Sequence, residues 1–304
     1  MATEVITTRR RRYLLDNERV LGSVLMTPAV IYIVALVGFP FVLAIIYALS
    51  DVTTGSRGFN FVGFDNFVRI LDDPVFLRSL RNTFVFAAIS NILVVVLAKA
   101  LAMILVADFK GKWVIRFFVL LPWTTPISLA TIMWLWTLDS LFSPIDWVLR
   151  WLGLIESNSY FLGKPGLAMA SVIIVHTWRI VPLAAVIMMA GLAAIPHEIN
   201  DAAQVDGAGF WRKLFEITIP LMAPIIAVAV LFGVILTITD MSVVWVLTRG
   251  GPTNSTQVLA TWSFLKGIEG GALSQGAAIA LFLLPVLVGL TVVILRLARR
   301  VEVF

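Results

Sequence analysis

Long apolar stretches alternate with shorter polar segments along the chain, and six of these stretches are long enough to cross a membrane. A helix needs about 20 predominantly apolar residues to span the hydrocarbon core of a bilayer. The first stretch contains no charged residue over its whole length. The predicted spans cover residues 21–50, 83–106, 117–138, 167–195, 219–239 and 275–295. We therefore predict an all-α, polytopic membrane protein with six transmembrane helices.

The composition supports this fold class. Hydrophobic residues make up 60% of the 304 residues and charged residues 13%, whereas soluble domains contain roughly 45–50% apolar and about 25% charged residues. The chain contains no cysteine and only two histidines, His176 and His197. The absence of cysteine excludes disulfides, thiolate nucleophiles and cysteine-ligated metals, and two histidines argue against a His-rich metal site.

Basic residues are distributed unevenly around the spans, and cytoplasmic loops of membrane proteins carry the excess of Lys and Arg. With the N-terminus inside, 13 basic residues fall in cytoplasmic segments and 8 in the longer outer segments. We therefore predict that both termini are cytoplasmic, with a basic tail over residues 1–20 and a transmembrane domain over 21–304. This asymmetry explains the net charge of +5 without nucleic acid.

The basic run at 9–12 precedes an apolar stretch that is roughly twice as long as the 7–15-residue core of a signal peptide, so we predict a retained anchor.

Three outer loops are predicted at 51–81, 139–166 and 241–273. In the second loop, apolar residues recur every three or four positions, which predicts a short amphipathic helix over 145–155. Its tryptophans, Trp147 and Trp151, are typical of an anchor at the membrane surface. A platform for an external partner is the alternative.

The cytoplasmic loop at 196–220 has the pattern of two short helices joined by a glycine turn. Pro196 suits the start of a helix, and Asp206 and Gly207 signal a turn. A second amphipathic stretch follows at 210–217, before Pro220 begins the next span. Four large apolar residues in this stretch favour insertion into a groove on another protein over a solvated connector. A loop that lies on lipid is the alternative.

This segment resembles the EAA loop of ABC importer permeases, whose pattern is Glu-Ala-Ala, three residues, Gly, nine residues, Ile, one residue and Leu-Pro. The matching positions, with Asp in place of Glu and Ile in place of Leu, are Asp201, Ala202, Ala203, Gly207, Ile217, Ile219 and Pro220. Residues 62–67, 81–83, 190–192 and 247–252, with Trp178 and Pro182, also resemble the maltose-type larger permease in its six-span form.

The resemblance implies a type I ABC importer permease fold in a bacterial inner membrane and a heteromeric assembly. The expected partners are a second permease subunit, two copies of an ABC ATPase and an extracytoplasmic sugar-binding protein. The chain has no Gly-x-x-x-x-Gly-Lys-Ser/Thr loop, so ATP and Mg²⁺ are expected on the ATPase, and no cofactor on this chain. The chain is thus expected to be a transporter subunit and not an enzyme.

Within the EAA loop, the resemblance implies a role for each residue type. Ala202 and Ala203 would allow close helix packing, Asp206 and Gly207 would form the bend, and Phe210 and Leu214 would fill a groove on the ATPase. The two helices would transmit closure of the ATPase to the spans as a rigid-body movement.

Ionisable residues inside spans mark a pathway by default, and four are predicted here: Lys99, His176, Arg179 and Asp240. Lys99 is expected to snorkel or to pair with an acid on a neighbouring span. His176 and Arg179 are three residues apart and share a helical face. No partner for His176 is evident from the sequence, so it is either a packed, hydrogen-bonded contact or a pathway residue.

Gly233, Thr237 and Asp240 follow one another at spacings of four and three, which places them on one helical face. By resemblance, this face lines the substrate path. The other residues expected on the path are Asn91, Trp136, Trp178 and Arg179. Trp136 also fits a lipid-interface belt.

The leading hypothesis is therefore a permease that passes a neutral di- or oligosaccharide, such as trehalose or a maltose-type sugar, into the cytoplasm by alternating access. A stand-alone ion-coupled transporter is the alternative, although six spans without a repeat fit poorly with inverted-repeat architecture. An intramembrane enzyme is a third class, and it would need catalytic pairs that the sequence does not display.

Overall fold

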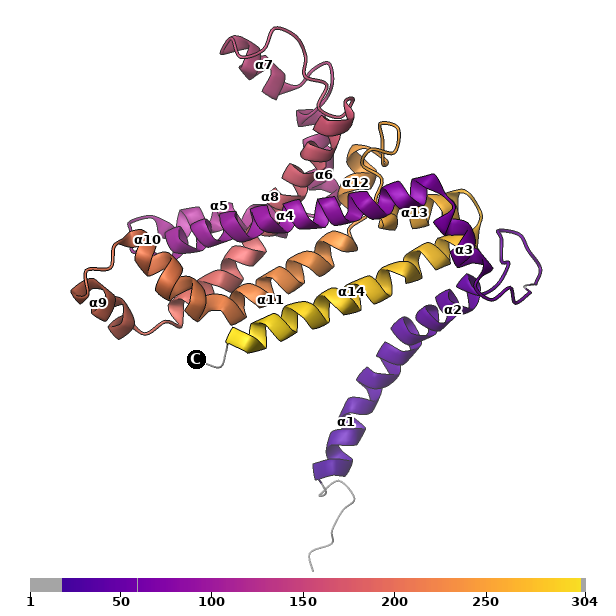
Figure 1. Ribbon diagram of the computed structural model, residues 1–304, viewed down its shortest axis with the longest axis horizontal. Helices are drawn as coiled ribbons and strands as arrows, with labels where there is room; N and C mark the ends of the chain where they lie inside the picture. Colours follow the sequence, from indigo (N-terminus) through magenta and orange to yellow (C-terminus); the bar gives the residue numbers. More distant parts are fainter. Residues whose placement is uncertain (1–17, 59, 302–304) are drawn as a thin grey trace, which may run out of the picture.

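The computed structural model describes residues 18–58 and 60–301. Its elements are α1 (Glu18–Ile33), η2 (Val34–Gly38), α2 (Phe39–Ala48), α3 (Asp65–Leu71), α4 (Pro74–Val106), α5 (Lys112–Thr124), α6 (Ile127–Thr137), α7 (Pro144–Trp151), α8 (Pro165–Ala193), α9 (His197–Val205), α10 (Phe210–Arg212), η3 (Lys213–Thr218), α11 (Ile219–Ile238), α12 (Ser242–Leu247), α13 (Leu259–Phe264), η4 (Leu265–Glu269) and α14 (Leu273–Val301) (Figure 1). The η segments are π-helical. Among these residues, β pairing is limited to one isolated bridge, Ser50 to Phe61. The predicted basic run at 9–12 lies outside the described residues.

The prediction of six spans is confirmed when α5 and α6 are counted as one bent span. The described residues then hold six helical segments that are long and apolar enough to cross a membrane. Three of them differ from the prediction, since the fifth also begins earlier, at Phe210. The second begins at Pro74, nine residues before the predicted start at 83, because the side chain of Asp73 accepts the backbone N–H of Val75 and caps the first turn. Much of the end of the predicted outer loop 51–81 is therefore helical.

The third span was predicted as one helix over 117–138, and this is wrong. The chain bends by 96° between α5 and α6. Thr125 adopts an extended conformation, with φ −72° and ψ 136°, because the ring of Pro126 disfavours a helical conformation in the preceding residue. Pro126 also lacks the backbone N–H that would continue the hydrogen-bond ladder.

The centre of the bundle is formed by α4, α8 and α11, which pack against one another along their lengths. Small residues lie at these contacts, including the buried Ala98 and Ala102 of α4 and Ala184 and Ala185 of α8. Small side chains allow transmembrane helices to approach closely and to gain van der Waals contact where no hydrophobic driving force exists. On the other side of the bundle, α14 packs against α2, α11 and α13.

Two parts of the chain stand apart from this bundle (Figure 1). The first is α1, none of whose residues is buried. The second is the outer part of the arm formed by α6 and α7, whereas the inner part of α6 packs against α12 and, through Trp134, against Trp178 of α8. The predicted amphipathic helix is present as α7, which ends before Gly153 at φ +70°. Its Trp147 and Trp151 are exposed, while Asp146 is buried and accepts hydrogen bonds from the backbone and hydroxyl of Ser159.

The contact between η4 and α14 requires glycine. A Cβ atom added at Gly276 would lie 2.9 Å from the backbone N of Gly267 and from the carbonyl O of Ser263, and neither backbone atom can move aside cheaply. We expect Gly276→Ala to lower the free energy of unfolding by about 1–3 kcal/mol, the usual cost of overpacking.

Unfolding in mild detergent, followed by circular dichroism, measures this effect. Gly289→Ala is the matched control because it lies on the same helix with no atom within 4 Å of the added methyl group. Equal stability of the two variants would contradict the proposed backbone contact.

Candidate functional site

The loop at 196–220, predicted to be cytoplasmic, has the predicted order of helix, glycine turn and helix. Its first helix, α9, follows Pro196 and ends with two hydrogen bonds, from Gly207 N–H to the carbonyl of Gln204 at 3.0 Å and from Ala208 N–H to the carbonyl of Ala203 at 2.9 Å. This pair of bonds is a Schellman motif, whose turn residue adopts a left-handed conformation. Gly207 has φ +72°, so this position favours glycine over any residue with a Cβ atom.

The second half of the loop differs from the prediction of a separate amphipathic stretch before the fifth span. The helix runs without interruption from Phe210 to Ile238 through α10, η3 and α11. The π-helical turn of η3 precedes Pro220, whose ring and missing N–H disturb ordinary α-helical bonding. The Thr218 hydroxyl donates to the carbonyl of Lys213 at 3.1 Å, five residues earlier. The loop and the span are therefore one continuous helix.

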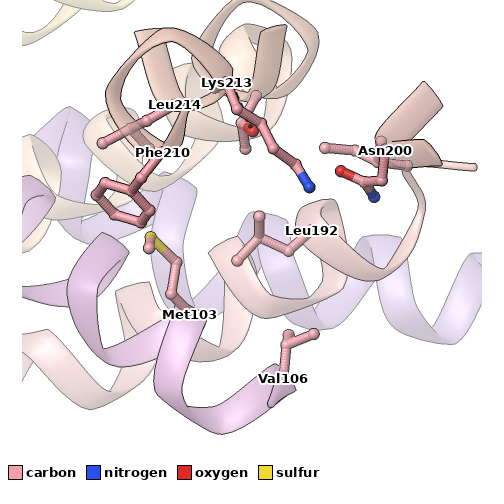
Figure 2. Close-up of a pocket in the computed structure, with 9 residues that line it drawn as sticks. Met103, Val106, Leu192, Asn200, Phe210, Lys213 and Leu214 are labelled. Carbon is pink, nitrogen blue, oxygen red and sulfur yellow. Dashed lines mark hydrogen bonds between the residues drawn. The ribbon is translucent and has the colours of Figure 1, made fainter. Parts of the chain in front are cut away.

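The residues of this loop face two directions. Phe210, which is still 58% exposed, and Leu214 line a cavity of about 280 Å³ between the loop and the adjacent ends of α4 and α8. Figure 2 shows the Phe210 ring beside Met103 and the amino group of Lys213 between Leu192 and Asn200. Of the two alanines predicted to allow close helix packing, Ala203 is buried and Ala202 is exposed. The side chains of Asp201 and Asp206 are exposed as well.

The most exposed apolar side chains of the loop are Val205, Trp211 and Phe215, at 88%, 67% and 60% of their full accessibility. The rings of Trp211 and Phe215 are stacked, with centroids 6.0 Å apart. These three residues were not among the predicted site residues. The signal was present in the sequence, because positions 211 and 215 lie one helical turn apart, on a different face from 210 and 214.

A second group of polar side chains lies inside the bundle, where α4, α8 and α11 meet. His176 Nδ1 is 2.9 Å from Asp240 Oδ2, and His176 Nε2 is 2.9 Å from the hydroxyl of Thr237. The same hydroxyl donates to the carbonyl of Gly233 and accepts a hydrogen bond from the amide of Asn91. All five residues are buried, and His176 is fully enclosed.

The hydrogen-bond partners of Thr237 and His176 indicate which ring nitrogen of the imidazole carries a proton. Because the Thr237 hydroxyl donates to Gly233, it can only accept from His176, so Nε2 carries a proton. Nδ1 and the carboxylate of Asp240 must then share one further proton. Asp240 Oδ1 also accepts the backbone N–H of Ser242 at 2.8 Å, at the start of α12. The pair therefore joins α8 to the end of α11 and to the start of α12.

This arrangement corrects two sequence predictions. His176 has a partner, Asp240, where none was evident, because the two residues are 64 positions apart and meet only through helix packing. Lys99 is buried and donates to the sulfur of Met222 at 2.8 Å. It forms no ion pair within the described residues, because the neighbouring side chain on α11 at that level is a methionine.

Gly233, Thr237 and Asp240 do share one face, as predicted, and Asn91 meets that face. A Cβ atom at Gly233 would collide with the side-chain oxygen of Asn91, so a larger residue here would displace the Asn91 amide from its bonds to Ala87 and Thr237.

The remaining predicted path residues do not take part in these hydrogen bonds. Arg179 lies over the ring of Trp123 at 5.3 Å and close enough to Asp240 for a favourable electrostatic interaction. Trp178 packs against Trp134 and lines an apolar groove of about 840 Å³ between α4, α5 and α8. Trp136 is exposed on α6.

Residues 95–303 match the family model described as "Binding-protein-dependent transport system inner membrane component". The chain is 31% identical over 293 residues to the sulfoquinovosyl glycerol transport system permease protein of Agrobacterium fabrum, covering 96% of this chain and 94% of that protein. It is 30% identical over 239 residues to the trehalose/maltose transport system permease protein of Thermococcus litoralis, covering 79% and 80%.

The fold is similar to that of a chain in the crystal structure of a bacterial alginate ABC transporter in complex with an alginate pentasaccharide-bound periplasmic protein. The TM-score is 0.80 at 20% identity, over 94% of this chain and 96% of that chain. At this identity the similarity shows the fold and carries no statement about substrate.

The buried pair of His176 and Asp240 predicts a large effect on stability. We expect Asp240→Ala to lower the free energy of unfolding by about 3–5 kcal/mol, because the substitution leaves a buried imidazole without its charge partner. Asp72→Ala removes an exposed aspartate and should change stability by no more than about 0.5 kcal/mol. Chemical unfolding in detergent compares the two variants. An effect of Asp240→Ala no larger than that of Asp72→Ala would show that the pair does not hold the helices together.

Proposed function

This chain belongs to the family of binding-protein-dependent transport system inner membrane components, and on that premise we propose that it passes a neutral di- or oligosaccharide into the cytoplasm by alternating access. The broader assignment is firm. The chain is a multi-pass membrane protein and the permease subunit of a carbohydrate ABC importer, and it is not itself an enzyme.

The observation that carries the proposal is the exposed apolar surface of the cytoplasmic loop, formed by Val205, Trp211 and Phe215. Exposed aromatic side chains in a cluster are typical of protein interaction sites. The partner is an ABC ATPase, which binds ATP and Mg²⁺. We infer that this surface enters a groove on the ATPase, while Phe210 and Leu214 keep the loop against α4 and α8.

The continuous helix from Phe210 to Ile238 provides the mechanical link. When two ATPase copies close on ATP, the loop moves with the ATPase that holds it. Because α10, η3 and α11 are one helix, that displacement becomes a rigid-body movement of α11. The turn at Gly207 sets the angle between the two helices that the ATPase contacts.

The proposed assembly also contains a second, different permease subunit and an extracytoplasmic sugar-binding protein. The uncovered apolar surface of α1 supports the permease pairing, because none of its residues is buried by the rest of the chain. In the proposed orientation both termini face the cytoplasm, which places the α9–α10 loop on the ATPase side of the membrane.

Two relatives support a sugar as substrate, since their printed names specify trehalose/maltose and sulfoquinovosyl glycerol transport. Within this chain the polar residues at Asn91, Thr237 and Asp240 are already bonded to one another or to His176. We propose that they brace the helices beside the path. Direct contact with the sugar at Gly233, Thr237, Asp240 or Asn91 would require these hydrogen bonds to break during transport.

A pull-down of the tagged chain from mild detergent tests the assembly. We expect the wild-type chain to retain an ATPase and a second permease, and Trp211→Glu to lose the ATPase, because a carboxylate in an apolar groove is strongly disfavoured. Gly207→Asp should also lose it, since the left-handed turn is strained for aspartate.

Phe142→Glu is the matched control, because Phe142 is 83% exposed but lies on the α6–α7 arm, away from the loop. Retention of the ATPase by Trp211→Glu would contradict the assigned docking surface. A wild-type chain that purifies alone and transports in liposomes would instead support the stand-alone ion-coupled transporter.

A further inference from the structure

A polar pocket lies at the opposite end of α4 from the cytoplasmic loop. Figure 1 shows α9 and α10 at one end of the bundle and α3 and α13 at the other. The pocket has a volume of about 390 Å³ and lies between the first turns of α4, the start of α8 and the segment that follows α12. Its lining residues are Arg78, Arg81, Asn82, Val85, Pro165, Met169, Thr253 and Ser255.

Hydrogen bonds from α4 hold the wall of this pocket in place. The Asn82 amide donates to three backbone carbonyls at 3.0–3.3 Å, those of Asn254, Ser255 and Gln257. Arg78 donates to the carbonyl of Thr253 at 2.7 Å. The pocket wall is thus formed by backbone that α4 fixes directly.

The same segment contains Arg249, Thr253 and Asn254 at φ values of +48° to +59°. Non-glycine residues adopt this left-handed conformation rarely, and it persists where surrounding bonds hold it. The pocket is therefore preformed, and a partner that fills it does not need to order the segment first.

The charges of the pocket are unbalanced. Arg78 and Arg81 are exposed and three residues apart on α4, a spacing at which like charges repel. No acidic residue lines the pocket. Among the described residues, Arg81 has no hydrogen-bond or ion-pair partner, and the nearby Asp73 is already paired with Lys266 at 3.3 Å. The buried hydroxyl of Ser255 also lacks a partner.

This chemistry recognises a carboxylate. A guanidinium group presents two parallel N–H donors that match the two oxygens of a carboxylate, and a second guanidinium and a free hydroxyl can bond the remaining lone pairs. In the proposed orientation the pocket opens on the outer side of the membrane. The family is binding-protein-dependent, and the proposed assembly places the sugar-binding protein over this face, so an acidic side chain of that protein can supply the carboxylate.

We propose that the Arg78–Arg81 pocket receives an acidic side chain of the extracytoplasmic sugar-binding protein and fixes the position of that protein over the permease. The proposal rests on the proposed function, because it needs the importer assembly and its orientation. Arg78 both shapes the wall and binds the carboxylate, whereas Arg81 only binds it.

The test uses the complete importer in proteoliposomes of neutral lipid and measures ATP hydrolysis as the sugar-loaded binding protein is added. We expect Arg81→Glu to raise the half-saturating concentration of binding protein by about tenfold, and Arg81→Gln to raise it less, because reversal adds repulsion to the lost attraction. The salt dependence of the half-saturating concentration should weaken in both variants.

Arg69→Gln is the matched control, because Arg69 is an exposed arginine on α3 that does not line the pocket. Half-saturating concentrations that are the same for Arg81→Glu and Arg69→Gln would overturn the assignment of the pocket. A shift that occurs only in vesicles containing anionic lipid would assign the pocket to a lipid headgroup and would also overturn it. If the wild-type assembly shows no stimulation by any sugar-loaded binding protein, the proposed function itself fails.

Discussion

The absence of water inside the bilayer is the constraint on which the rest of this structure depends. Every backbone N–H and carbonyl in the hydrocarbon must find its partner within the protein, and each unsatisfied group costs several kcal/mol. The chain meets this requirement with long helices, and two of its departures from regular α-helix lie next to Pro220 and Pro126. At Pro220 the helix widens into a π-helical turn and the Thr218 hydroxyl bonds a carbonyl of that turn. At Pro126 the helix stops and the span turns through 96°.

The same constraint explains how much of the fold can be predicted from the sequence. Apolar stretches of sufficient length specify the spans, and the Asp206–Gly207 pair specifies the turn after α9, because both depend on local chemistry. The bend at Thr125 also had a local signal, Pro126, but the apolar pattern continues across it. Partners such as His176 and Asp240 cannot be predicted in this way, since their contact depends on how α8 and α11 pack.

The fifth span shows why the continuous helix matters more than any single contact in the loop. Its first turns expose Trp211, and just beyond its other end Asp240 is bonded to His176 and to the start of α12. A loop connected through a flexible linker would dissipate a movement before it reached the membrane. Here a movement of the loop would reach the buried bond between His176 and Asp240, so α11 would have to pivot about His176 or break that bond.

The second span extends this argument to the whole thickness of the molecule. Arg81 lies at the outer pocket and Met103 at the cavity beneath the loop, both on α4. At 1.5 Å per residue, an unbroken helix separates them by about 33 Å. If the outer pocket binds the sugar-binding protein and the loop binds the ATPase, both proteins act on one rigid element. Coupling between binding sites is reciprocal, so a position of α4 that favours docking outside also favours the matching state of the ATPase inside, without any additional messenger.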